Sequence, residues 1–79
     1  MLLKINKPFI IDNLNKYPPA VVAQLEQLLA SGVKARLDPT RRNFYEVDHT
    51  ERVFFFHALP ASGKVMLLAS WPALPAPAL

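Results

Sequence analysis

Residues 52–71, RVFFFHALPASGKVMLLASW, hold two apolar runs joined by the turn-forming sequence Pro60-Ala61-Ser62-Gly63. Proline and glycine favour a tight connection here, so the stretch predicts two antiparallel strands, residues 52–59 and 64–71. Side chains in a strand alternate between the two faces of a sheet, and in both runs each face carries large apolar groups. A single covering layer leaves one of these faces open, and the question is what covers it.

The sequence upstream supplies one covering layer. Between Pro18 and Gly32, apolar residues recur at helical spacing, which predicts an amphipathic helix of about 13 residues. Proline suits the first turn of a helix, and glycine suits the position just after its end. The apolar stripe consists of Val21, Val22, Leu25, Leu28 and Leu29.

After Gly32 the pattern changes from a helical to an alternating period, which is typical of strands. Two shorter strands are expected over residues 33–38 and 43–48, separated by a turn at Asp38-Pro39-Thr40. The predicted fold is therefore α+β, with one helix packed on a four-stranded antiparallel meander.

The two ends of the chain are expected to be extended. Residues 2–12 contain Pro8, which disfavours a central strand, so an edge strand or an extended arm is predicted. Residues 72–79 are rich in proline and alanine and predict a polyproline-like tail. Residues 1–71 are expected to form a single small domain.

Composition limits the classes of function. The chain has 79 residues and no cysteine, which excludes disulfides and thiolate metal sites. Lys4 and Lys7 interrupt any signal-peptide core, and no apolar run approaches the roughly 20 residues that span a bilayer. A cytoplasmic protein without membrane contact, metal or cofactor is expected.

The apolar excess predicts a partner. Hydrophobic residues make up 52% of the chain and charged residues 19%, which is rich in apolar groups for a small monomer. We expect the helix to cover the face of Phe55 and Leu67, with the other face meeting a second copy of the chain. The interface residues predicted on that basis are Phe54, Phe56, Met66 and Leu68. The main functional hypothesis is a non-catalytic interaction module that acts as a homodimer.

No catalytic constellation is recognisable, which favours a non-enzyme. His49 falls in a polar turn, His57 falls in an apolar strand, and neither has carboxylates at a metal-ligand spacing. The serines lack the flanking glycines of a nucleophile elbow.

A group of basic residues supports an alternative function. The net charge is +3, and Lys34, Arg36, Arg41 and Arg42 gather near Phe44 and Tyr45. Basic side chains beside aromatic rings are what a polyanion such as single-stranded nucleic acid uses. Weak, salt-sensitive binding of RNA or DNA by these four residues is the prediction.

The same region carries a resemblance to a known family. Residues 41–59, RRNFYEVDHTERVFFFHAL, resemble the central hairpin of RelE/ParE-type toxins, in which a strand reading R-x-x-Y-x-V-D turns into a long apolar strand. The resemblance implies an RNA-binding or RNA-cleaving protein. That family usually has two N-terminal helices, and this chain has room for one.

Overall fold

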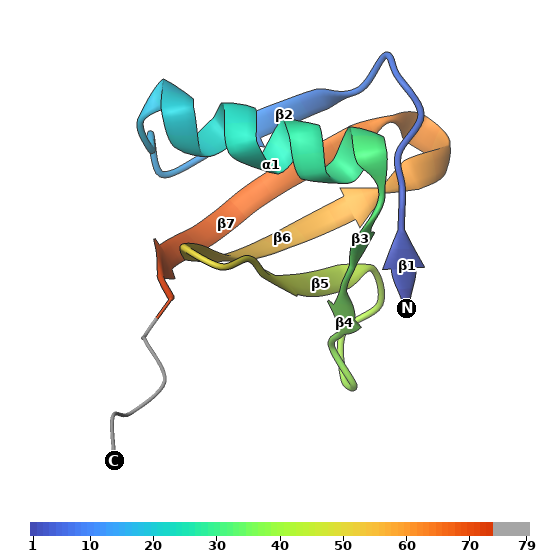
Figure 1. The fold of residues 1–79 in the computed structure, drawn as a ribbon. Helices are drawn as coiled ribbons and strands as arrows, with labels where there is room; N and C mark the ends of the chain where they lie inside the picture. Colours follow the sequence, from blue (N-terminus) through green and yellow to red (C-terminus); the bar gives the residue numbers. More distant parts are fainter. Residues whose placement is uncertain (74–79) are drawn as a thin grey trace.

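The computed structural model describes residues 1–73, in which a single α-helix packs on a mixed β-sheet. The elements in chain order are β1 (Leu2–Leu3), β2 (Ile10–Asn13), α1 (Pro19–Ser31), β3 (Val33–Lys34), β4 (Arg36–Leu37), β5 (Phe44–Asp48), β6 (Arg52–Leu59), the 3-10 helix η1 (Pro60–Ser62) and β7 (Lys64–Pro72). Five strands form one sheet in the order β2-β7-β6-β5-β4, and β1 pairs with β3 in a two-stranded ribbon. Figure 1 shows α1 lying across one face of the larger sheet.

Helix α1 confirms the helical prediction. It begins at Pro19 in the first turn and ends at Ser31, where Gly32 adopts a φ of 93°. The N–H of Gly32 donates to the carbonyl of Leu28 at 2.9 Å, which satisfies one of the last free carbonyls of the helix. The stripe that faces the sheet buries Val21, Leu25 and Leu29.

The hairpin of β6 and β7 is the centre of the sheet. Leu59 pairs with Lys64 next to the turn, and Phe56 pairs with Leu67. Phe55 then pairs with Ala69, so Leu68 is an extra residue on β7 and forms a β-bulge. After the bulge the alternation of β7 is shifted by one residue. Leu67 therefore lies on the face of Phe56, and Ala69 lies on the face of Phe55.

The sheet differs from the predicted four-stranded meander. The predicted strand 33–38 is divided into β3, which pairs with β1, and β4, which joins the larger sheet. Strands β4, β5, β6 and β7 are antiparallel neighbours, but β2 joins the edge of β7 in parallel, which makes the sheet five-stranded and mixed. The N–H of Ile10 also donates to the carbonyl of Gly63 at 2.9 Å, which anchors the start of β2 beside the turn. Pro8 lies just before β2, where its missing N–H costs no ladder hydrogen bond. Of the two alternatives predicted for residues 2–12, an edge strand or an extended arm, β2 is an edge strand.

The prediction of which face the helix covers was wrong. Phe54 and Phe56 are fully buried beneath α1, in the same hydrophobic core as Leu25 and Leu29 of the helix. The alternation of β5 explains the outcome, because Tyr45 and Val47 share the covered face while Glu46 lies on the opposite one. If α1 covered the face of Phe55, it would bury the carboxylate of Glu46. The buried core consists of Leu3, Ile5, Val21, Leu25, Leu29, Ala35, Tyr45, Val47, Phe54, Phe56, Ala58, Val65 and Leu67.

The predicted tail falls mostly outside the described chain. Pro72 is the last residue of β7, and the N–H of Ala73 donates to the carbonyl of Glu51 at 3.1 Å. Residues 74–79 lie outside the described residues.

Candidate functional site

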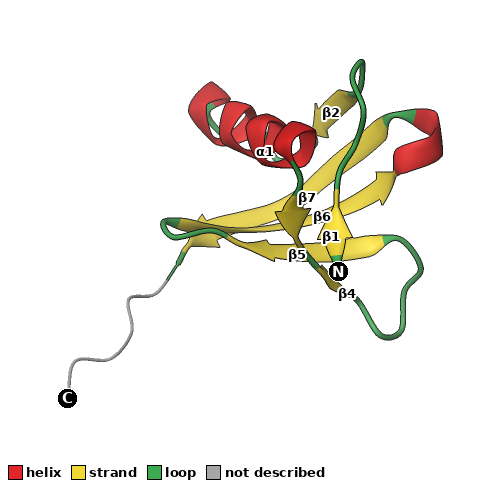
Figure 2. Cartoon of the chain, turned by 45° about the vertical axis from the view of Figure 1, so that its right-hand side comes forward, coloured by secondary structure: helices red, strands yellow, loops and turns green. Residues whose placement is uncertain are grey.

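The face of the five-stranded sheet opposite α1 is the candidate site, and we call it the open face. Figure 2 shows α1 on one side of the sheet, and residues 1–73 place no α-helix on the other side. The cross-strand register puts large side chains there in neighbouring rows. They are Ile10, Phe44, Val53, Phe55, His57, Leu59, Met66 and Trp71.

Exposure varies across the open face. Ile10 is 74% exposed and Trp71 is 42% exposed, whereas Phe55, His57 and Met66 are half-buried by their neighbours. Scattered apolar side chains are normal on protein surfaces, but a continuous group on one sheet face is typical of a contact surface.

A stack of three planar groups stiffens one part of the open face. The rings of Phe44 and His57 are nearly parallel, with an angle of 3° between their planes and a centroid distance of 4.5 Å. The guanidinium carbon of Arg41 lies 4.8 Å from the centroid of Phe44 and 5.3 Å from that of Phe55. Such contacts restrict the motion of these side chains.

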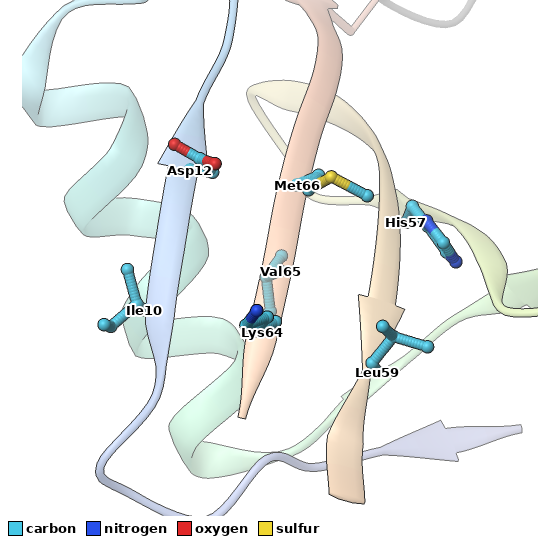
Figure 3. Close-up of a pocket in the computed structure, with 7 residues that line it drawn as sticks. All are labelled: Ile10, Asp12, His57, Leu59, Lys64, Val65 and Met66. Atoms are coloured by element: carbon cyan, nitrogen blue, oxygen red, sulfur yellow. The ribbon is translucent and has the colours of Figure 1, made fainter. Parts of the chain in front are cut away.

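A cavity lined in part by His57 lies beside this stack. Its volume is about 220 Å³, and its lining comes from β2, β6 and β7. Figure 3 shows Asp12 and Ile10 on β2, with Met66 pointing toward His57 across the strands. Cavities for drug-sized ligands measure about 300–1,000 Å³, so this one suits a single side chain or a very small molecule. The lining residues are Ile10, Asp12, His57, Leu59, Lys64, Val65 and Met66.

The structure separates the predicted interface residues. Met66 lies on the open face, while Phe54 and Phe56 are inaccessible in the folded chain. Leu68 is half-buried at the bulge, and its carbonyl accepts a hydrogen bond from the side chain of Asn15. Of the predicted set, Met66 alone lies on the open face and lines the cavity.

The predicted polyanion site is partly neutralised. Arg36 donates to Glu46 at 2.8 Å and also pairs with Asp48. The pKa of the Arg36 guanidinium is raised, chiefly by the hydrogen bond that it donates to Asp48. Arg41 pairs with Asp38 at 3.2 Å. For Lys34 and Arg42, no ion pair forms with any residue of 1–73.

The two histidines have separate roles in the fold. The side chain of Gln24 contacts Nδ1 of His49 at 3.2 Å, which links α1 to the turn between β5 and β6. His57 lies half-buried on the open face, in the apolar strand where the sequence predicts it. No group of three or more metal-ligating side chains comes together in the described part of the chain.

Two parts of the site were missed from the sequence. Ile10 and Asp12 reach the cavity because β2 pairs with β7, a parallel contact between segments more than 50 residues apart. Trp71 falls in the predicted strand 64–71, but it was not predicted as a site residue, because its 42% exposure depends on the absence of a covering layer over the open face.

No protein-family model, curated protein or solved structure matches the chain. These comparisons therefore lend no support to the resemblance of residues 41–59 to RelE/ParE-type toxins. Across residues 1–73, every helix is too short or too polar to cross a membrane.

Proposed function

We propose that this protein is a small, non-catalytic interaction module that acts as a homodimer through the open face of its sheet. The observation that carries the proposal is the row of large apolar side chains opposite α1, which no other described element covers. Burial of one such side chain contributes about 1.5–3 kcal/mol when its exposure is complete, and less for the half-buried residues here.

The geometry of the open face supports a second sheet as the partner. Two sheets pack face to face about 10 Å apart, with strands within about 30° of each other, and bury alternating residues of both inner faces. With a two-fold axis, the same surface of each copy forms both sides of the interface. Glu46 and Asp48 lie beside the apolar groups on β5, where the polar rim of an interface tolerates them.

Light scattering coupled to gel filtration tests the proposal. The unmodified chain is expected to elute as a dimer at tens of micromolar. The variant Met66→Asp places a carboxylate in the contact and is expected to elute as a monomer, because an unpaired buried charge is costly. Gln27→Asp, on the exposed side of α1, is the matched control and should remain dimeric. A monomeric unmodified chain under these conditions would sink the proposal.

RNA binding or cleavage remains the second candidate. Its support is the position of Lys34 and Arg36, which line one shared hollow, although Glu46 and Asp48 line it as well. The carboxylates paired with Arg36 and Arg41 leave less free positive charge than the sequence suggests. Any affinity should fall steeply with salt, because binding releases counterions.

Fluorescence anisotropy with labelled single-stranded RNA, at low and at moderate salt, measures this affinity. The substitution Lys34→Ala should weaken it, while Lys7→Ala, at the lysine that pairs with Glu26 of α1, should not. Absence of binding at micromolar protein and low salt removes the second candidate.

A further inference from the structure

We infer that Trp71 of one copy fills the cavity of the other, with its indole ring against Ile10, Leu59 and Met66. This inference rests on the proposed homodimer and specifies its central contact. It is drawn from the position of Trp71, the chemistry of the cavity and the symmetry that a homodimer requires.

Trp71 is available for such a contact. It pairs with Val53 across β6 and β7, so the register places it on the open face with Phe55. At 42% exposure it is among the most exposed large side chains of the sheet. Exposure of a large aromatic ring to water is unfavourable. Tryptophan is also among the residues most enriched at the positions that contribute most to binding energy in interfaces.

The cavity offers what an indole ring needs. Its apolar walls come from Ile10, Leu59 and Met66, and methionine sulfur makes favourable contacts with aromatic rings. Asp12 supplies a carboxylate that can accept a hydrogen bond from the indole N–H, and Lys64 supplies a cation for the face of the ring. The volume, about 220 Å³, is below that of sites for drug-sized ligands, which favours a single side chain as the occupant.

A two-fold axis brings the two parts together. The cavity lies at the Lys64 end of β7, and Trp71 lies near the other end. Consider a two-fold axis that lies midway between the two sheets and runs perpendicular to the strands. It makes the two copies of β7 run in opposite directions, so that each Trp71 lies over the cavity of the partner. The dimer then contains this contact twice.

The same axis gives complementary shape and charge elsewhere. It brings the small Ala69 of one copy over the larger Met66 of the other, so that the two layers can interdigitate. It also brings Arg41, in the turn before β5 of one copy, toward Glu46 and Asp48 on β5 of the other. These features favour a second copy of the chain over an unrelated partner.

Intrinsic fluorescence is a direct readout, because Trp71 is the single tryptophan of the chain. A dilution series that takes the protein from dimer to monomer, followed in parallel by sedimentation, is expected to shift the emission to longer wavelength. Quenching by acrylamide should increase over the same range. Asp12→Ala, which keeps the fluorophore, should weaken dimerisation and move the shift to higher concentration.

Substitutions at Trp71 test the same contact from the other side. Trp71→Ala should raise the dimer dissociation constant at least tenfold, whereas Leu2→Ala, exposed on the separate β1–β3 ribbon, should not change it. Trp71→Phe keeps a ring without the N–H, so Asp12→Ala should have little further effect in that background. Circular dichroism verifies that each variant is folded, and Trp71→Phe serves if the alanine variant is not.

The outcomes separate the two proposals. If the unmodified chain is a monomer throughout, the proposed function fails and this inference fails with it. If the chain is a dimer but its emission does not change on dilution, and Trp71 variants dimerise normally, the inference alone is overturned. A small ligand that binds the cavity of the dimer without dissociating it would also overturn it.

Discussion

Asp38 organises the turn that leads into β5. Its carboxylate accepts hydrogen bonds from the backbone N–H and the hydroxyl of Thr40, each at 2.9 Å, and from the N–H of Arg41 at 3.0 Å. The backbone hydrogen bond from Thr40 is the largest cause of a pKa lowered from 3.8 to about 2. Because the folded value lies below the unfolded one, the ionised carboxylate stabilises the fold above roughly pH 4, and this stabilisation is lost between about pH 4 and pH 2.

The variant Asp38→Asn isolates that contribution, since the amide keeps one acceptor oxygen but no charge. We expect a modestly lower melting temperature at pH 7 and a shallower loss of stability between about pH 4 and pH 2 than in the unmodified chain. Thermal melts followed by circular dichroism across this range measure both. Parallel curves for the two proteins would contradict the assignment of the low pKa to this turn.

Neighbouring phenylalanines on β6 should differ sharply in their importance for stability. Phe56 is fully buried beneath α1, and Phe55 is half-buried on the open face. Phe56→Ala should lower the free energy of unfolding by about 3–5 kcal/mol, as large-to-small changes in a core do. Phe55→Ala should cost clearly less when urea unfolding is measured at low protein concentration. Equal losses would show that both faces of the sheet are covered within one chain.

At the scale of the elements, the turn between β6 and β7 depends on Gly63. This residue has a φ of 65°, and a Cβ there would lie 3.1 Å from the carbonyl oxygen of Pro8, next to β2. The left-handed conformation costs a residue other than glycine about 1–2 kcal/mol. Gly63→Ala should therefore destabilise the protein by at least that amount, measured by urea unfolding. Ser62→Ala, in the same turn, is the control and should change the stability little.

The elements that depend on local sequence were predictable. Helix α1 follows from its apolar spacing between Pro18 and Gly32, and the β6–β7 hairpin follows from its turn residues. The bulge at Leu68 and the parallel pairing of β2 were not, because neither has a signal in its own short segment. The covered face could have been read from β5, where Tyr45 and Val47 alternate with charged residues.

At the scale of the molecule, the sequence predicted the open face of the sheet but not the cavity on it. The apolar excess indicated an open sheet face, and that face is present, but with Phe55 and Met66 on it rather than Phe54 and Phe56. The cavity could not be foreseen, because it forms only where β2, β6 and β7 come together. The cavity depends on contacts between segments that are distant in the sequence, and the spacing of apolar residues within one segment does not indicate such contacts.

Dimerisation should make the heat stability of the whole molecule depend on its concentration. A chain of 79 residues has a small core, since domains of this size bury only about 60–65% of their unfolded surface. A partner that binds only the folded form adds stability by mass action, about 2.7 kcal/mol when its free concentration is 100 times the dissociation constant. A tenfold increase in protein concentration should therefore raise the melting temperature by a few degrees. In Met66→Asp, which cannot form the contact, the melting temperature should be lower and independent of concentration. Scanning calorimetry of both proteins over two decades of concentration measures this, and a melting temperature that does not change with concentration in the unmodified chain would refute the dimer as a source of stability.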